Sequence, residues 1–178
     1  KKVFLGCLLL VSTLSASAQR YVCKSGETSF FSETPMENIS AVNKNVTAIL
    51  DVPTNSIAVK MQMADFVFTN KLMQEHFNEN YMESEKYPTG VFSGKINETI
   101  DFSKEGSYPI SATGKFVIHG VAQTRTIKGM LTIKSGTVQL VSNFDVKLAD
   151  HKIDIPTVVM AKIAESVAVK DKFTFTKQ

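Results

Sequence analysis

The stretch TVQLVSNFDVKL, residues 137–148, decides the fold class because apolar and polar side chains alternate along it. Its apolar positions are Val138, Leu140, Phe144, Val146 and Leu148. Successive side chains of a β-strand point to opposite faces of the sheet, so this pattern predicts a strand with one buried and one solvated face. Strands of this kind are typical of antiparallel sheets.

Two segments upstream of this stretch have the same alternation. Phe116 and Ile118 alternate with a lysine and a histidine, and the apolar residues of 127–134 alternate with lysines and a threonine. Residues 120–123 and the pair Ser135-Gly136 have the composition of short turns. We therefore expect three consecutive strands that are joined as a meander.

Five further segments are rich in strand-forming residues, so the whole chain has about eight candidate strands. These segments are Thr28–Ser32, Val46–Val52, Ile57–Phe68, Val91–Phe102 and Val167–Phe175. Within the third, the apolar alternation shifts after Met63, which indicates a bulge near Ala64 and Asp65. Eight antiparallel strands can close into a barrel, and closure removes exposed sheet edges. The sequence therefore predicts an all-β protein with an antiparallel eight-stranded barrel.

One segment has the spacing of a helix. Residues 71–81 follow Thr69 and Asn70, either of which can cap a helix N-terminus. The apolar and aromatic stripe of this segment is formed by Leu72, Met73, His76, Phe77 and Tyr81. We expect a short helix that lies against the barrel and closes one end. A weaker helical turn is expected after Pro156, from Val158 to Ile163.

The first residues have the pattern of a secretory signal peptide. Lys1 and Lys2 precede an apolar run from Val3 to Val11, and the small residues Ala16 and Ala18 follow. This apolar run is too short to span a bilayer stably. We expect residues 1–18 to be removed and the protein to be exported to the periplasm.

The remaining residues 19–178 suit one domain with one core. The net charge of +3 falls to about +1 without Lys1 and Lys2, so no strong attraction to nucleic acid is expected. Cys23 is then the single cysteine, which excludes an internal disulfide. A homodimer is left open.

The sequence contains little that favours catalysis. His76, His119 and His151 are far apart, and none has a second histidine at the spacing of one helix face, so no metal site is expected. There is no Gly-x-Ser-x-Gly motif and no glycine-rich phosphate loop. We expect no catalytic residue, no cofactor and no enzymatic activity.

Two motifs resemble those of the YceI family. The segment MQEHFNENYMESEKYPTGVFSGKI, residues 73–96, is similar to a family pattern with His-Phe on a short helix, a tyrosine, then Tyr-Pro and a strand that opens with phenylalanine. The segment ATGKFVIHGVAQTRTIKGMLTI, residues 112–133, resembles the family's strand pair around Ile-His-Gly-Val. The two motifs occur in the family's order and at a fitting separation.

This resemblance implies a lipocalin-like barrel of the periplasm whose apolar cavity binds a polyisoprenoid or another long-chain lipid without catalysis. The apolar alternation of the strands, together with Met73, Phe77 and Tyr81 of the helix at one end, then supplies the expected ligand-contacting residues. They are Phe66, Phe68, Met73, Phe77, Tyr81, Phe92, Phe116, Ile118, Leu131, Ile133, Leu140, Phe144, Val167 and Phe173. Two other functions remain open from the residues alone: a barrel filled by its own side chains that acts as an envelope interaction module, and an enzyme acting on a lipid.

Overall fold

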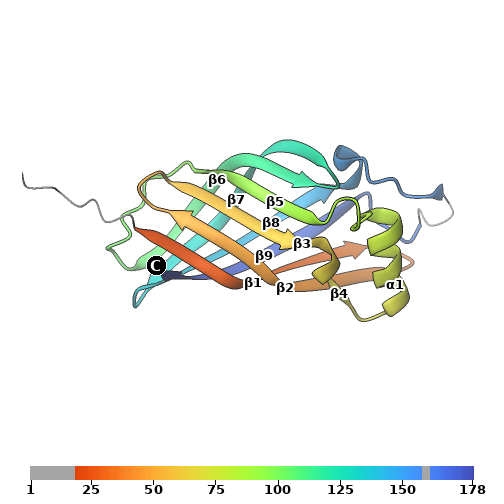
Figure 1. The fold of residues 1–178 in the computed structure, drawn as a ribbon, viewed down its shortest axis with the longest axis horizontal. Coiled ribbons are helices and arrows are strands. Elements are labelled where there is room, and N and C mark those ends of the chain that lie inside the picture. The colour runs from red at the N-terminus through yellow and green to blue at the C-terminus, as the bar shows by residue number, and fades with distance from the viewer. Residues whose placement is uncertain (1–18, 158–160) are drawn as a thin grey trace, which may run out of the picture.

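The alternating segments form antiparallel strands that close into a barrel in the computed structural model, which describes residues 19–157 and 161–178 (Figure 1). The strands are β1 Arg20–Glu33, β2 Asn38–Asp51, β3 Ser56–Gln62, β4 Val67–Phe68, β5 Thr89–Ile96, β6 Gly106–Ile118, β7 Val121–Lys134, β8 Thr137–Lys147 and β9 Ser166–Lys177. Eight of these pair in the ring order β1-β2-β3-β5-β6-β7-β8-β9, and β9 pairs with β1. The two-residue β4 pairs with β2. The predicted eight-stranded antiparallel barrel is confirmed.

Several strand bounds differ from those expected. The strand expected over 91–102 ends at Ile96, and the strand expected over 57–68 is interrupted by a 3-10 helix, Met63–Asp65, in place of a bulge. This helix lets both Met63 and Phe66 point inward, which accounts for the shift in apolar alternation. β1, β2 and β6 extend beyond their predicted segments because small and polar residues weaken the alternation at their added ends.

Two tight turns join β6, β7 and β8 into the predicted meander. The first turn consists of His119 and Gly120, with φ of 49° and 69°, and the second of Ser135 and Gly136, with φ of 49° and 74°. Positive φ at both central residues is the requirement of a type I′ turn, whose twist matches that of the flanking strands. The turn predicted at residues 120–123 was therefore placed too late, because β7 already begins at Val121.

One short helical segment lies across an end of the barrel, as expected (Figure 1). α1 spans Lys71–His76 and continues as a single π-helical turn, η2, over Phe77–Tyr81. The Asn70 side chain accepts a hydrogen bond from the Leu72 amide and is the N-cap. A 3-10 helix, η3, spans Leu148–His151 at the same end.

Two expectations fall on residues that the structure does not describe. The predicted signal peptide, residues 1–18, lies outside the described residues, and the helical turn expected over 158–163 includes 158–160, which also lie outside them. Within the described ranges, no helix has the length and hydropathy needed to cross a membrane.

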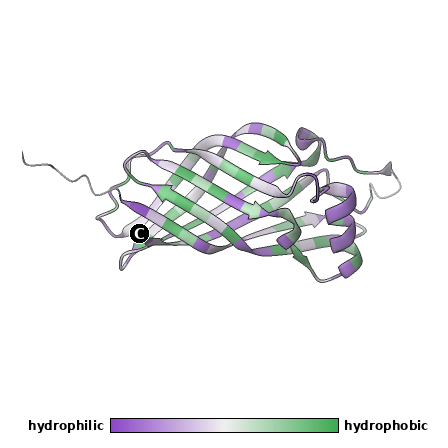
Figure 2. Ribbon diagram, viewed as in Figure 1, coloured by the Kyte–Doolittle hydropathy of each residue, from purple (hydrophilic) through white to green (hydrophobic). Residues whose placement is uncertain are grey.

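The barrel interior is filled at the end opposite α1. Hydrophobic residues alternate with hydrophilic ones along the strands (Figure 2). The inward side chains at this end are tightly buried, and they include Tyr21, Cys23, Leu50, Phe102, Leu131, Ile133, Val138 and Phe175. Tyr21 and Phe102 stack with ring centroids 5.7 Å apart. This half of the barrel is an ordinary packed core.

Candidate functional site

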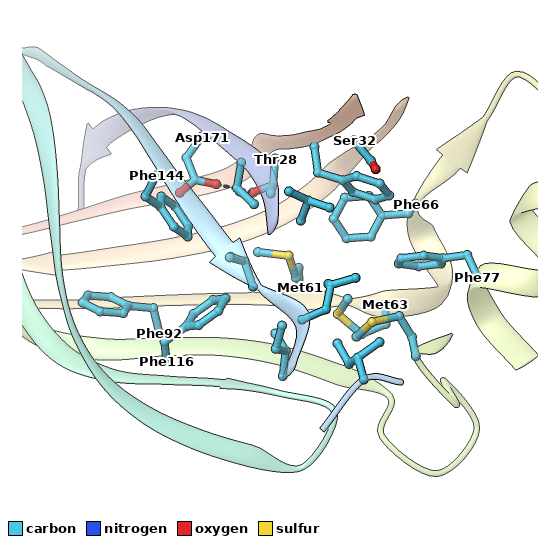
Figure 3. Close-up of a pocket in the computed structure, with 18 of the residues that line it drawn as sticks. Thr28, Ser32, Met61, Met63, Phe66, Phe77, Phe92, Phe116, Phe144 and Asp171 are labelled. Carbon is cyan, nitrogen blue, oxygen red and sulfur yellow. Dashed lines mark hydrogen bonds between the residues drawn. The ribbon is translucent and has the colours of Figure 1, made fainter. Parts of the chain in front are cut away.

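The other half of the barrel, beneath α1 and η2, contains a cavity of about 450 Å³ (Figure 3). Strands from every side of the barrel contribute to its wall, and the helical segment contributes to its mouth. Protein cavities that take small ligands typically measure about 300–1,000 Å³ and are mostly apolar. The cavity is therefore large enough for a ligand of modest size or for part of a longer chain.

Twelve of the fourteen residues expected to contact a ligand line this cavity. They are Phe66, Phe68, Met73, Phe77, Tyr81, Phe92, Phe116, Ile118, Leu140, Phe144, Val167 and Phe173. Leu131 and Ile133 do not line it. Both side chains point inward, but they are buried in the filled half and pack beyond the end of the cavity. Their alternation correctly identified the inner face of β7. Their depth along the barrel axis, which alternation does not give, keeps them out of the cavity wall.

The wall combines flat aromatic rings with flexible thioethers. Met61, Met63 and Met82 line the cavity together with the phenylalanines, although the sequence analysis did not select these methionines. Methionine has three rotatable bonds and a polarisable sulfur, so it adapts to irregular apolar shapes. This wall suits a flexible apolar ligand better than a rigid polar one.

An aromatic cluster holds the helical segment over the cavity. The Phe77 ring of η2 packs against the rings of Phe30, Phe66 and Phe68, with centroid separations of 5.6, 5.6 and 5.1 Å. Phe77 lies on the predicted apolar stripe of the helix. Aromatic pairs at such distances contribute about 0.5–1.5 kcal/mol each beyond area burial. Phe77 is consequently both part of the wall and the main attachment of the lid.

The two sequence motifs meet beside the mouth. The His119 ring packs edge-on against Tyr87 at 4.7 Å, and its Nε2 lies 2.8 Å from the Glu83 carboxylate. Its Nδ1 lies 3.0 Å from the His151 carbonyl oxygen. Because both nitrogens face acceptors, the imidazolium form, which has two donors, satisfies both contacts. The hydrogen bond with His119 lowers the pKa of Glu83. His119 thus ties the loop that follows η2 to η3.

Side chains close a gap between β7 and β8 at this end. The backbone pairing of these strands stops at Gly129 and Ser142, so the segments beyond that point separate. The Arg125 Nη2 donates a hydrogen bond to the Asp145 backbone carbonyl at 2.6 Å. The side-chain Nε2 of Gln123 donates to the Asp150 backbone carbonyl at 2.8 Å. The hollow half of the barrel is therefore held at this seam by side chains.

A polar group interrupts the apolar wall near the cavity floor. Asp171 of β9 is 8% exposed and lines the cavity with Thr28 of β1 and Ser142 of β8 (Figure 3). The Thr28 hydroxyl donates to Asp171 Oδ1 at 2.7 Å, and the Ser142 hydroxyl donates to Oδ2 at 2.9 Å. The next inward residue of β9 is Phe173, where the packed core begins.

Burial raises the pKa of the Asp171 carboxyl, and the hydrogen bonds from Thr28 and Ser142 offset this rise only in part. Desolvation disfavours the charged form of a carboxyl that has no cationic partner. Among the other ionisable residues that line the cavity and are described, Glu37 and Lys162 form a 4.0 Å ion pair with each other, and Lys128 of β7 occupies an exposed position.

The residues of this polar group were not among the predicted ligand-contacting residues, because only apolar and aromatic positions were considered as cavity wall. Ser142 lies on the inward alternation between Leu140 and Phe144, and Asp171 lies on that of β9. Polar residues at inward positions were the signal that could have identified them. No group of three or more histidine, cysteine or acidic side chains that could hold a metal ion occurs among the described residues.

A family model described as the YceI-like domain matches residues 21–175. No match is found among curated proteins.

Solved structures share the fold at low sequence identity. Burkholderia cenocepacia BcnA is 16% identical, with a TM-score of 0.72, over 84% of this chain and 95% of its own. A domain from Saccharophagus degradans described as polyisoprenoid-binding is 9% identical, with a TM-score of 0.76, over 91% and 100%. A Campylobacter jejuni YceI protein is 16% identical, with a TM-score of 0.57, over 100% and 98%. At these identities the likeness shows the fold.

The aromatic attachment of the lid can be tested with Phe77→Ala. Because Phe77 is half-buried, we expect a loss of about 2 kcal/mol in the free energy of unfolding, less than for a fully buried phenylalanine. Amide hydrogen exchange over residues 71–81 should also become faster. Glu75→Ala, an exposed change in the same helix, is the control and should alter neither quantity. An unchanged exchange rate in Phe77→Ala would contradict this role.

The raised pKa of Asp171 predicts a specific pH dependence. The unfolded chain releases this proton near the ordinary aspartate pKa of 3.8, while the folded protein retains it to higher pH. The contribution of Asp171 to stability is therefore complete at low pH and falls as pH rises through that window. Asp171→Asn does not titrate, so its melting temperature relative to the unsubstituted protein should increase as the pH rises above about 4. Parallel melting profiles would show that the carboxyl titrates as in the unfolded chain.

Proposed function

The chain belongs to the YceI-like domain family, and from this we propose that its cavity binds a long apolar lipid, a polyisoprenoid or a similar amphiphile. The observation that carries the proposal is the apolar cavity of about 450 Å³, walled by strands and closed by an aromatic lid. The polyisoprenoid-binding description of the similar Saccharophagus degradans domain supports the same ligand class.

The energetics of burial favour such a ligand. Each methylene group moved out of water contributes about 0.8 kcal/mol, so a chain that fills the cavity gains several such increments. Ordering of the chain and loss of its free motion offset part of this gain. A preformed cavity lowers that cost because the wall needs little rearrangement.

The binding role is favoured over the two alternatives. A barrel filled throughout by its own side chains is less consistent with a cavity that occupies one half of the interior. An enzyme acting on a lipid needs convergent reactive groups, and the cavity wall presents one buried carboxyl with two hydroxyls that donate to it. We propose that the protein carries or stores its lipid without altering it.

Matched substitutions in the two halves of the barrel test this function. Ala112 lines the cavity, whereas Ala48 points inward and is not part of the cavity wall. Ala112→Phe should reduce the amount of lipid that copurifies, measured by mass spectrometry after extraction, with little change in melting temperature. Ala48→Phe should instead overpack the interior and cost about 1–3 kcal/mol of stability. If the chain copurifies with no lipid and takes up none from vesicles, or if Ala112→Phe leaves uptake unchanged, the proposal fails.

We also propose that the protein acts in the periplasm after export. The support is the charged and apolar pattern of residues 1–18, which ends in small residues. Expression of the chain with this segment in a Gram-negative host should yield a periplasmic protein. Its intact mass should equal that of a chain that begins at Gln19. A retained segment, or a lipid mass on Cys7 or Cys23, would contradict this.

A further inference from the structure

We propose that Asp171, Thr28 and Ser142 form a polar subsite at the cavity floor that binds the hydroxyl group of a long-chain alcohol. The ligand then enters with its hydroxyl first, and its chain extends toward the lid. This inference rests on the proposed lipid-binding function and specifies the chemical class of the lipid.

The first argument is the hydrogen-bonding capacity that the subsite leaves unused. An aspartate carboxylate has about four lone-pair positions, and Thr28 and Ser142 occupy one on each oxygen. A ligand without a donor would leave the remaining acceptors unpaired in an apolar cavity, which is costly. A hydroxyl can donate a hydrogen bond to either oxygen of the charged carboxylate. It can also accept a hydrogen bond from the protonated carboxyl, so it suits both protonation states.

A neighbouring buried amide illustrates the difference from a purely structural polar group. Asn43 is paired with Thr28 across β1 and β2 and is completely buried. Its Nδ2 donates to the Gln62 carbonyl at 2.8 Å, and its Oδ1 accepts from the Asn45 amide at 2.8 Å. Both ends of Asn43 are thus satisfied by the backbone, and Asn43 does not line the cavity. Asp171, in contrast, lines the cavity and its hydrogen bonds come from two side chains of the cavity wall.

The charge around Asp171 disfavours other head groups. No salt bridge to Asp171 occurs among the described residues, and the nearest lysines along the chain, Lys128 beside Gly129 and Lys170 and Lys172 of β9, are exposed. A phosphate or carboxylate head group would therefore meet a carboxyl without a compensating cation. An ammonium head group would also have to offset the cost of ionising a carboxyl whose pKa burial raises.

The strands pack closely beside the subsite, which favours a compact head group. Gly129 of β7 is paired with Ser142 and lines the cavity next to it. A methyl group at this position would lie 2.8 Å from the Val141 carbonyl oxygen and 3.4 Å from the Ser142 Cβ. It would also lie 3.1 Å from the Leu140 Cδ1, so glycine at this position lets β7 and β8 pack closely beside Ser142.

The test compares geranylgeraniol with its methyl ether, which lacks the donor and keeps the chain. Affinities of the delipidated full chain are measured by displacement of a fluorescent fatty-acid probe. We expect the alcohol to bind about tenfold more tightly than the ether, the effect of one buried hydrogen bond. In Asp171→Leu this ratio should fall to about one, while the affinity for the ether is retained.

Two further variants separate the possible causes. Val169→Leu changes the neighbouring inward residue of β9 and should keep the ratio near tenfold. A steric effect of the ether methyl group would persist in Asp171→Leu, whereas a hydrogen bond would not. If Asp171→Leu does not fold, Asp171→Asn replaces it, and its ratio should also fall because the amide donates to ether and hydroxyl oxygens alike.

The outcomes distinguish this inference from the proposed function. Equal binding of alcohol and ether by the unsubstituted protein, or a ratio unaffected by Asp171→Leu, would overturn the subsite and leave lipid binding in place. Tighter binding of geranylgeranylamine that depends on Asp171 would overturn the assignment to an alcohol. Failure of the unsubstituted protein to bind any of these compounds would count against the lipid-binding function itself.

Discussion

The structure depends on the packing of one half of an eight-stranded barrel. A barrel of this size is just wide enough for inward side chains to fill it or for one small ligand to occupy it. Here the half that contains Leu131 and Phe175 is filled, and the half beneath α1 is hollow. Cys23 is buried and free, so no disulfide supports the described barrel. The packed half must therefore hold the strands in register for the whole ring, including the part that encloses the cavity.

The hollow half is held together at its perimeter, since its interior has few side chains to pack. Phe77 fixes the helical segment through an aromatic cluster, His119 connects the loop after η2 to η3, and Arg125 spans the seam between β7 and β8. These contacts join the two family-like motifs: Glu83 and Tyr87 come from the first motif and contact His119 of the second. Such local contacts can open without disruption of the packed half, and a closed cavity requires that property if a lipid is to enter.

Apolar alternation was sufficient to predict the barrel and most of the cavity wall, because a strand side chain faces either inward or outward. It could not predict depth along the barrel axis. Leu131 and Ile133 face inward as expected and yet belong to the packed half. It also could not predict the polar subsite, since a charged residue such as Asp171 is expected to face solvent when polarity alone is considered. The register that sets Asp171 opposite Thr28 and Ser142 comes from pairings between strands far apart in the sequence.

The position of Asp171 at the boundary between the two halves gives it properties that neither half would provide. Deeper in the barrel, the carboxyl would be enclosed by protein alone, as the Asn43 amide is, whose hydrogen bonds are both with the backbone. Near the mouth, it would be solvated and its pKa would lie near the ordinary value. At the floor of the cavity it is desolvated, its hydrogen bonds come from two short side chains, and it lines the cavity. Replacement of all three polar residues by apolar ones of similar shape would be nearly neutral for folding, because no group would remain unpaired. The fold therefore does not require this polar group, and its chemistry is available to distinguish one apolar chain from another.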